Sequence, residues 1–124
     1  MSYITSNNRL ITVLTANLTG DGIGADSISI PTIGMIHAIE LQGATFTSGT
    51  LTIDGDTNGI THSILTTTAN QDYIFYIRTI EHDSTGGDLI SYTYPVINGD
   101  VVISVTSVGI AEVGVVYIHM LENA

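Results

Sequence analysis

Apolar and polar side chains alternate with a period of two along most of the chain, which predicts β-strands. Isoleucine, valine and threonine, whose branched side chains suit a pleated sheet, fill the alternating runs. No window of eleven or more residues shows the 3.6-residue period of an amphipathic helix. The expected strands cover residues 9–16, 27–30, 35–42, 50–53, 60–65, 73–79, 89–94, 101–106 and 113–121.

Turn signals rich in glycine, asparagine and aspartate separate these runs. Many short strands without room for helical crossovers predict an all-β fold, an antiparallel β-sandwich of jelly-roll-like form with about eight strands. Residues 1–8 are polar and aperiodic, so we expect a flexible N-terminal arm there and a single domain over residues 9–124.

Two of the expected strands are apolar on both faces, whereas a half-exposed antiparallel strand should alternate. The last strand carries Val116, Ile118 and Met120 on one face and Val113, Val115, Tyr117 and His119 on the other. Such a strand is either central to a two-sided core or covered on one face by another subunit. Because a large exposed apolar patch promotes aggregation, we expect a subunit interface. The expected interface residues are Val113, Val115, Tyr117, His119, Tyr73 and Phe75.

The composition is poor in charge and strongly acidic. Of 124 residues, 11% are charged, against about 25% in a typical soluble domain. There are twelve acids, two arginines and no lysine, which excludes nucleic-acid binding and disfavours an anionic membrane surface. Cysteine is absent, which excludes disulfides. The N-terminus lacks the features of a signal peptide, so we expect a soluble product that is made in the cytoplasm and not exported by the classical route.

The stretch "DGDTNG" (54–59) spells the first half of an EF-hand loop, with Asp54, Asp56 and Asn58 at the ligand positions. The twelfth position is Leu65, which cannot bind calcium, and the flanking segments are strand-like where an EF-hand has helices. The same residues also close a hairpin turn. We therefore expect a plain turn, with a weak non-EF calcium site as the alternative.

No motif for catalysis or for a cofactor is present. The four histidines (His37, His62, His82 and His119) lack the paired spacing of metal sites, and "GDGIG" (20–24) lacks the lysine and helix of a phosphate loop. No serine lies in a nucleophile elbow. Glu40 is the one acid within an expected strand, and its neighbours Ala38 and Gln42 suggest a solvated face. We expect no enzyme and no cofactor.

The segments "GTLTIDGDTNG", "YTYPVINGDVVISV" and "GVVYIHML", within residues 50–121, resemble the small jelly-roll decoration (cement) proteins of tailed bacteriophages. The resemblance implies a structural virion protein, a homotrimer that binds the lattice of the phage major capsid protein and stabilises the shell. It implies a location on the capsid surface and no catalytic residues. It also implies that an N-terminal arm contacts the shell, here Met1, Ser2, Tyr3 and Ile4.

Two other functions stay open at this point. One is a carbohydrate- or receptor-binding head module of a phage fibre, for which exposed tyrosines would provide a stacking surface. The other is a small hydrolase or isomerase, which would need clustered acids or histidines in a pocket.

Overall fold

The structure is a computed structural model. It describes the backbone of residues 2–4, 9–82 and 88–123 and the side chains of residues 12–78 and 94–121. The described residues form strands and no helix, so the expected all-β antiparallel fold is confirmed. The strands are β1 (Ser2–Ile4), β2 (Arg9–Thr19), β3 (Asp26–Gln42), β4 (Thr50–Thr57), β5 (Ile60–Thr68), β6 (Tyr73–Tyr76), β7 (Thr79–His82), β8 (Asp88–Thr93), β9 (Val96–Thr106) and β10 (Val113–Asn123).

The strands pair as one antiparallel sheet in the order β1-β2-β10-β3-β9-β4-β5, with β6 on β3 and a separate β7–β8 hairpin. The long strand β3 divides this sheet into two parts. Its first part, Asp26–Met35, pairs with β9, and its second part, Met35–Gln42, pairs with β10 while β6 lies on its other side. One layer is therefore β2-β10-β3-β6, and the other is β3-β9-β4-β5.

The two layers enclose a single core. The side chains at its centre have no more than 2% of their surface exposed. They come from both layers and include Leu18, Ile36, Ile39, Leu41, Leu51, Ile53, Val101, Ile103, Val105, Val116, Ile118 and Met120. Because β3 passes from one layer to the other, the two layers form a sandwich that is closed at this corner. Jelly-roll connectivity stays a prediction.

The middle of β3 differs from the expectation. Residues 27–30 and 35–42 belong to one strand, because Pro31 lies where β3 has a neighbour on one side only and needs no second ladder bond. The expected strand at 73–79 instead ends at Tyr76, and β7 begins at Thr79.

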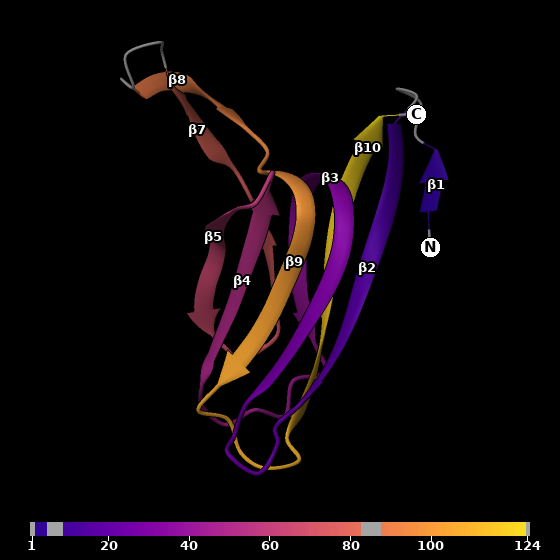
Figure 1. The fold of residues 1–124 in the computed structure, drawn as a ribbon. Coiled ribbons are helices and arrows are strands. Elements are labelled where there is room, and N and C mark those ends of the chain that lie inside the picture. The colour runs from indigo at the N-terminus through magenta and orange to yellow at the C-terminus, as the bar shows by residue number, and fades with distance from the viewer. Residues whose placement is uncertain (1, 5–8, 83–87, 124) are drawn as a thin grey trace.

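The strands run along one axis, and the loops collect at its two ends (Figure 1). The loops after β2, β3, β5 and β9 share one end. The termini, the β4–β5 turn and the β7–β8 hairpin lie toward the other. In the expected arm, Ser2–Ile4 form β1 on the edge of β2, and the remaining residues of the arm lie outside the described part of the chain. Within the described ranges, no helix is long and apolar enough to cross a membrane.

Candidate functional site

The outward-facing side of the β2-β10-β3-β6 layer is our candidate functional surface, because many of its side chains are apolar. Its residues are placed by the pairing register, since directly opposed residues share a face. We call its apolar centre the β10 outer face and define it as Val13, Ala38, Glu40, Ile74, Tyr76, Val115, Tyr117, His119 and Leu121. The polar residues Thr15, Asn17 and Gln42 lie on the same side of the layer, opposite Tyr117 and Val115.

This face is apolar and incompletely covered in a single chain. Val115, Tyr117 and His119 are half-buried, whereas Ile74 and Tyr76 expose 47% and 63% of their surface. None of the nine residues belongs to the core cluster, because that cluster lies on the opposite side of the layer. β10 therefore has one side in the core and a second, largely apolar side that is only partly covered, with Val115, Tyr117 and His119 half-buried and Leu121 buried.

The outward side of the other layer is polar in its middle, although Ile33 and Val96 are exposed at one end of it. One cross-strand row consists of Ser27, Ser104, Thr52 and Thr66, and the Ser27 and Ser104 hydroxyl oxygens lie 3.0 Å apart. Such a surface is typical of an antiparallel layer that faces water. The contrast between the layers singles out the β10 outer face as the candidate site.

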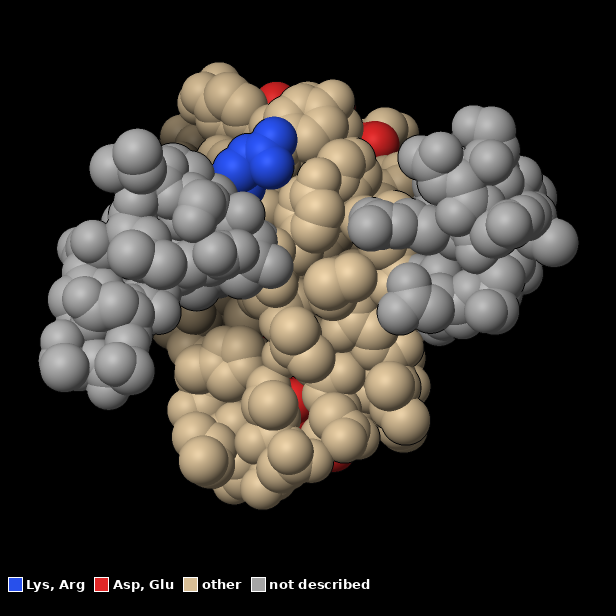
Figure 2. All heavy atoms as spheres, turned by 90° about the horizontal axis from the view of Figure 1, so that it is seen from above, with Lys and Arg blue, Asp and Glu red and all other residues tan. Residues whose placement is uncertain are grey.

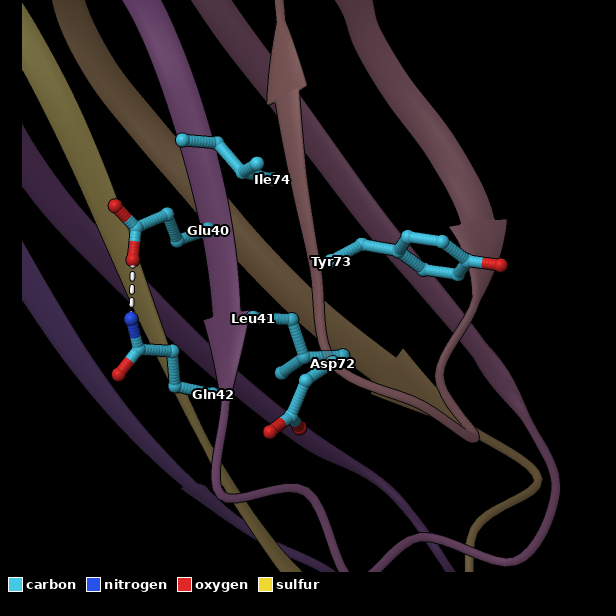
Figure 3. Close-up of a pocket in the computed structure, with 6 residues that line it drawn as sticks. All are labelled: Glu40, Leu41, Gln42, Asp72, Tyr73 and Ile74. Carbon is cyan, nitrogen blue, oxygen red and sulfur yellow. Dashed lines mark hydrogen bonds between the residues drawn. The ribbon is translucent and has the colours of Figure 1, made fainter.

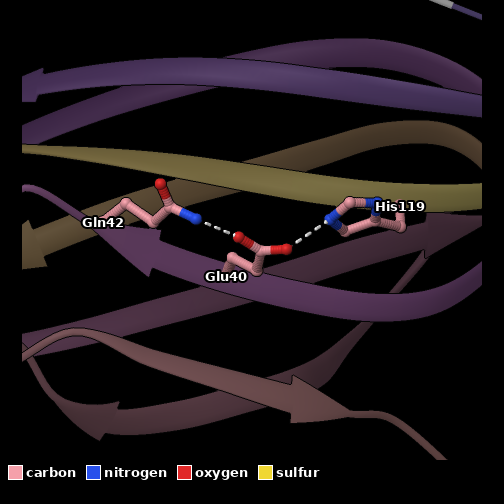
Figure 4. A network of polar contacts seen from close by, with 3 residues as sticks. All are labelled: Glu40, Gln42 and His119. Atoms are coloured by element: carbon pink, nitrogen blue, oxygen red, sulfur yellow. Dashed lines mark hydrogen bonds and ion pairs between the residues drawn. The ribbon is translucent and has the colours of Figure 1, made fainter.

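A polar network crosses the middle of the apolar surface (Figure 4). The His119 Nε2 and Glu40 Oε1 atoms lie 3.0 Å apart, and the Gln42 amide donates to the other oxygen of Glu40. The side chains of His119 and Glu40 are only 25% and 20% exposed. Glu40, assigned to a solvated face from the sequence, is therefore a half-buried partner of His119, as an isolated acid among apolar neighbours must be.

His37 lies beside this network at a β-bulge. His119 is opposite Ala38 and Met120 is opposite Ile36, so His37 is the extra residue of β3. Bulges of this kind redirect a side chain. The His37 ring meets those of Tyr76 and Tyr94 edge-on, with centroids 5.8 and 5.4 Å away. Among the described residues, its buried Nδ1 atom has no hydrogen-bond partner.

A shallow pocket of about 430 Å³ lies at the end of the same layer, between β3 and β6. Figure 3 shows its lining residues, Glu40, Leu41, Gln42, Asp72, Tyr73 and Ile74. The Asp72 carboxylate accepts hydrogen bonds from the backbone N–H groups of Gly43 and Ala44, so it holds the adjacent loop. The polar side chains Glu40, Gln42 and Asp72 of the pocket therefore already form hydrogen bonds within the chain.

The structure places Tyr73 and Phe75 on the other side of β6 from the β10 outer face, and their expected interface role stays a prediction. Phe75 is opposite Ile39, packs against the core, and has the Tyr73 ring 5.4 Å away. The side of β6 that shares a face with Tyr117 carries Ile74 and Tyr76 instead. The sequence showed both faces of this strand to be apolar. It did not show which face is which, because that depends on the register with β3.

Val113, the remaining expected interface residue, begins β10 and is 41% exposed. Of the expected shell-binding residues, Met1 lies outside the described residues. Ser2, Tyr3 and Ile4 form the backbone of β1, and their side chains also lie outside the description.

The "DGDTNG" stretch forms the end of β4 and a two-residue turn. Asn58 and Gly59 have φ values of 52° and 86°, as the tight hairpin turn that favours Asn-Gly requires. Asp56 accepts a hydrogen bond from the Thr61 hydroxyl at 2.7 Å, and Asn58 accepts one from Asn98 at 2.9 Å. No group of three or more acids, histidines or cysteines that could hold a metal is found in the described part of the chain.

The other histidines are separate from this site. His62 lies on β5, 3.0 Å from the Thr57 hydroxyl, and His82 ends β7, where side chains are not described. The "GDGIG" segment is a loop whose backbone pairs with the β9–β10 loop, through Val108 N–H to Gly24 O at 3.0 Å and Ala111 N–H to Gly20 O at 2.9 Å.

Glu112 holds this loop end together. Its carboxylate accepts hydrogen bonds from the Gly109 N–H at 2.6 Å and from the hydroxyl and N–H of Thr47 at 3.1 and 3.4 Å. The bond from Gly109 is the main cause that lowers the pKa of Glu112, and Thr47 adds to it.

Comparisons with protein-family models, curated proteins and solved structures give no match to this chain.

Proposed function

We propose that this chain is a structural, non-enzymatic protein that assembles with copies of itself through the β10 outer face. In the fuller form of the proposal, a homotrimer decorates a tailed-phage virion and binds its major capsid protein. The observation that carries the proposal is the largely apolar outward side of the β10 layer, in which Ile74 and Tyr76 are exposed around a half-buried Glu40–His119 pair.

Burial of this face provides the driving force for assembly. Covering an apolar side chain completely contributes about 1.5–3 kcal/mol relative to leaving it exposed, and Ile74, Tyr76 and Tyr117 each retain exposed surface in a lone chain. A trimer would then present three identical ends to a shell, so that weak contacts add through avidity.

The pairing order supports the jelly-roll part of the proposal. A jelly roll has eight strands in two layers. Here the layers β2-β10-β3-β6 and β3-β9-β4-β5 each contain four, with β3 serving in both. The low proportion of charged residues is also consistent with extensive contacts. Seen from the end with the termini, acidic and basic side chains cover only small parts of the described surface (Figure 2).

The first test is the mass of the protein in solution, measured by native mass spectrometry. We expect a species three times the 13.1 kDa of one chain. Tyr117→Arg, which places a charge in the apolar face, is expected to yield folded monomers. Thr52→Arg, on the polar outward side of β4, is expected to leave the trimer intact. A wild-type monomer at all concentrations would overturn the proposal.

The shell contact needs a separate test, in which the trimer is sedimented with undecorated tailed-phage capsids. The N-terminal arm, with Met1, Ser2, Tyr3 and Ile4, remains the proposed shell-binding segment. Deleting residues 1–8 should therefore abolish co-sedimentation without changing the trimer mass. A trimer that ignores shells would remove the capsid role and leave the assembly standing.

A second candidate is a carbohydrate-binding fibre head, favoured by one observation. The Tyr73 ring is 44% exposed in the pocket beside Glu40 and Gln42, and such a ring can stack on a sugar. Binding on a glycan array that disappears with Tyr73→Ala would support this candidate.

A further inference from the structure

We propose that protonation of His37 releases the copies that cover the β10 outer face, so that assembly is tight near neutral pH and weak in mild acid. This inference rests on the proposed function, because it concerns the regulation of the same surface.

The position of His37 makes a positive charge there difficult to accommodate. The bulge turns its ring against Tyr76, which is part of the β10 outer face, and against Tyr94. Its Nδ1 atom is buried without a partner among the described residues. A neutral ring tolerates this environment, whereas an imidazolium would have a buried N–H with nothing to accept it.

The charged and titratable groups around His37 are mostly cationic. From β10 it is faced by His119, and from the segment after β6 by Arg78, whose guanidinium carbon lies 5.6 Å from the Tyr94 ring centroid. Tyr76 and Tyr94 face His37 with their aromatic rings. The acid nearest in the network, Glu40, is already paired with His119. Protonated His37 would therefore face like charges.

Burial is the largest cause that lowers the pKa of His37 from its ordinary value of 6.5, and the charges of His119 and Arg78 lower it further. A second copy that covers Tyr76 would remove more water from the ring and lower the pKa again. The separated chains then bind protons more readily than the assembled ones, so assembly is fully favoured above the pKa of the free chain and weakens as the pH falls through it.

The direction of this effect separates it from the effect of overall charge. Each chain has a formal net charge of −10 at pH 7. Acidification reduces that charge and with it the repulsion between copies, which by itself would strengthen assembly. Weaker assembly in mild acid therefore requires a specific group such as His37.

The experiment measures the dissociation constant by sedimentation velocity at about pH 7.5 and about pH 5.5, a range in which histidine is the side chain expected to titrate. The wild type is expected to dissociate more readily at the lower pH, by about tenfold for each unit by which the contact lowers the pKa of His37. His37→Phe keeps a ring against Tyr76 and Tyr94 and should lose this pH response. His62→Phe, on the polar layer, should keep it.

A second variant keeps the inference testable if His37→Phe does not fold. His119→Gln retains a hydrogen-bond donor for Glu40 and removes one of the charges that lower the pKa of His37, so its release of copies should begin at a higher pH than in the wild type. Wild-type assembly that is unchanged or tighter at the lower pH overturns this inference and leaves the proposed function intact. A wild type that is monomeric at both pH values removes the proposed function itself.

Discussion

At the scale of single residues, Gly59 and Gly22 offer a matched pair. A Cβ added at either would meet no atom within 4 Å, but only Gly59 has a left-handed backbone, with φ of +86°. Steric crowding of a Cβ in that region costs about 1–2 kcal/mol. Gly59→Ala should lower the free energy of unfolding by about that amount, whereas Gly22→Ala should leave it nearly unchanged.

Urea denaturation of both glycine variants, followed by tyrosine fluorescence, provides the measurement. Equal effects of the two substitutions would mean that the β4–β5 turn does not have the conformation described for Asn58 and Gly59.

Glu112 gives a second prediction at this scale. Because its hydrogen bonds with Gly109 and Thr47 favour the ionised form, Glu112→Gln should lower the melting temperature at neutral pH. The lowered pKa means that the contribution of Glu112 is present above the ordinary pKa of a glutamate and is lost as the pH falls through the lowered value.

Melting curves between neutral and strongly acidic pH should therefore show the difference between wild type and Glu112→Gln shrinking in acid. Asp100→Asn, on the exposed surface of β9, serves as the control and should have little effect at either pH. A difference that persists unchanged at the acidic end would contradict the assigned role of Glu112.

At the scale of strands, alternation along the chain predicted most of what the structure contains. The runs at 50–53, 60–65 and 113–121 are parts of β4, β5 and β10, and the structure extends each of them. Alternation could not predict that β3 continues through Pro31, because a proline ends a strand only where its N–H would be needed. β3 forms a corner because its first part pairs with β9 and its second part pairs with β10.

Only part of the candidate site could be predicted from the sequence, because alternation shows which residues share a side of one strand but not how that strand lies against the others. Val115, Tyr117 and His119 were assigned correctly to one side of their strand, since the period of two fixes that within a single strand. Ile74 and Tyr76 were not among the expected interface residues, because the side of β6 that shares a face with Tyr117 is set by its register with distant residues. His37 joins the site through a bulge, which no alternating pattern reveals.

At the scale of the whole molecule, the two layers differ in how well their outward sides suit contact with water. The layer with Thr52 and Ser104 is complete as a surface in water. The layer with β10 is not, because its outward side combines exposed apolar residues with a half-buried Glu40–His119 pair. The proposed assembly would cover this side with copies of the chain, which would account for the small number of charged residues.

The most direct test of this account measures the accessibility of the β10 outer face. The chain has no cysteine, so single substitutions provide clean probes. Val115→Cys and Thr52→Cys replace residues that are both half-buried in one chain, on the outward sides of the two layers. The account predicts that maleimide labelling of Val115→Cys slows as the protein concentration rises, while labelling of Thr52→Cys does not. Labelling of Val115→Cys at a rate independent of concentration, in a protein that stays monomeric, would contradict it.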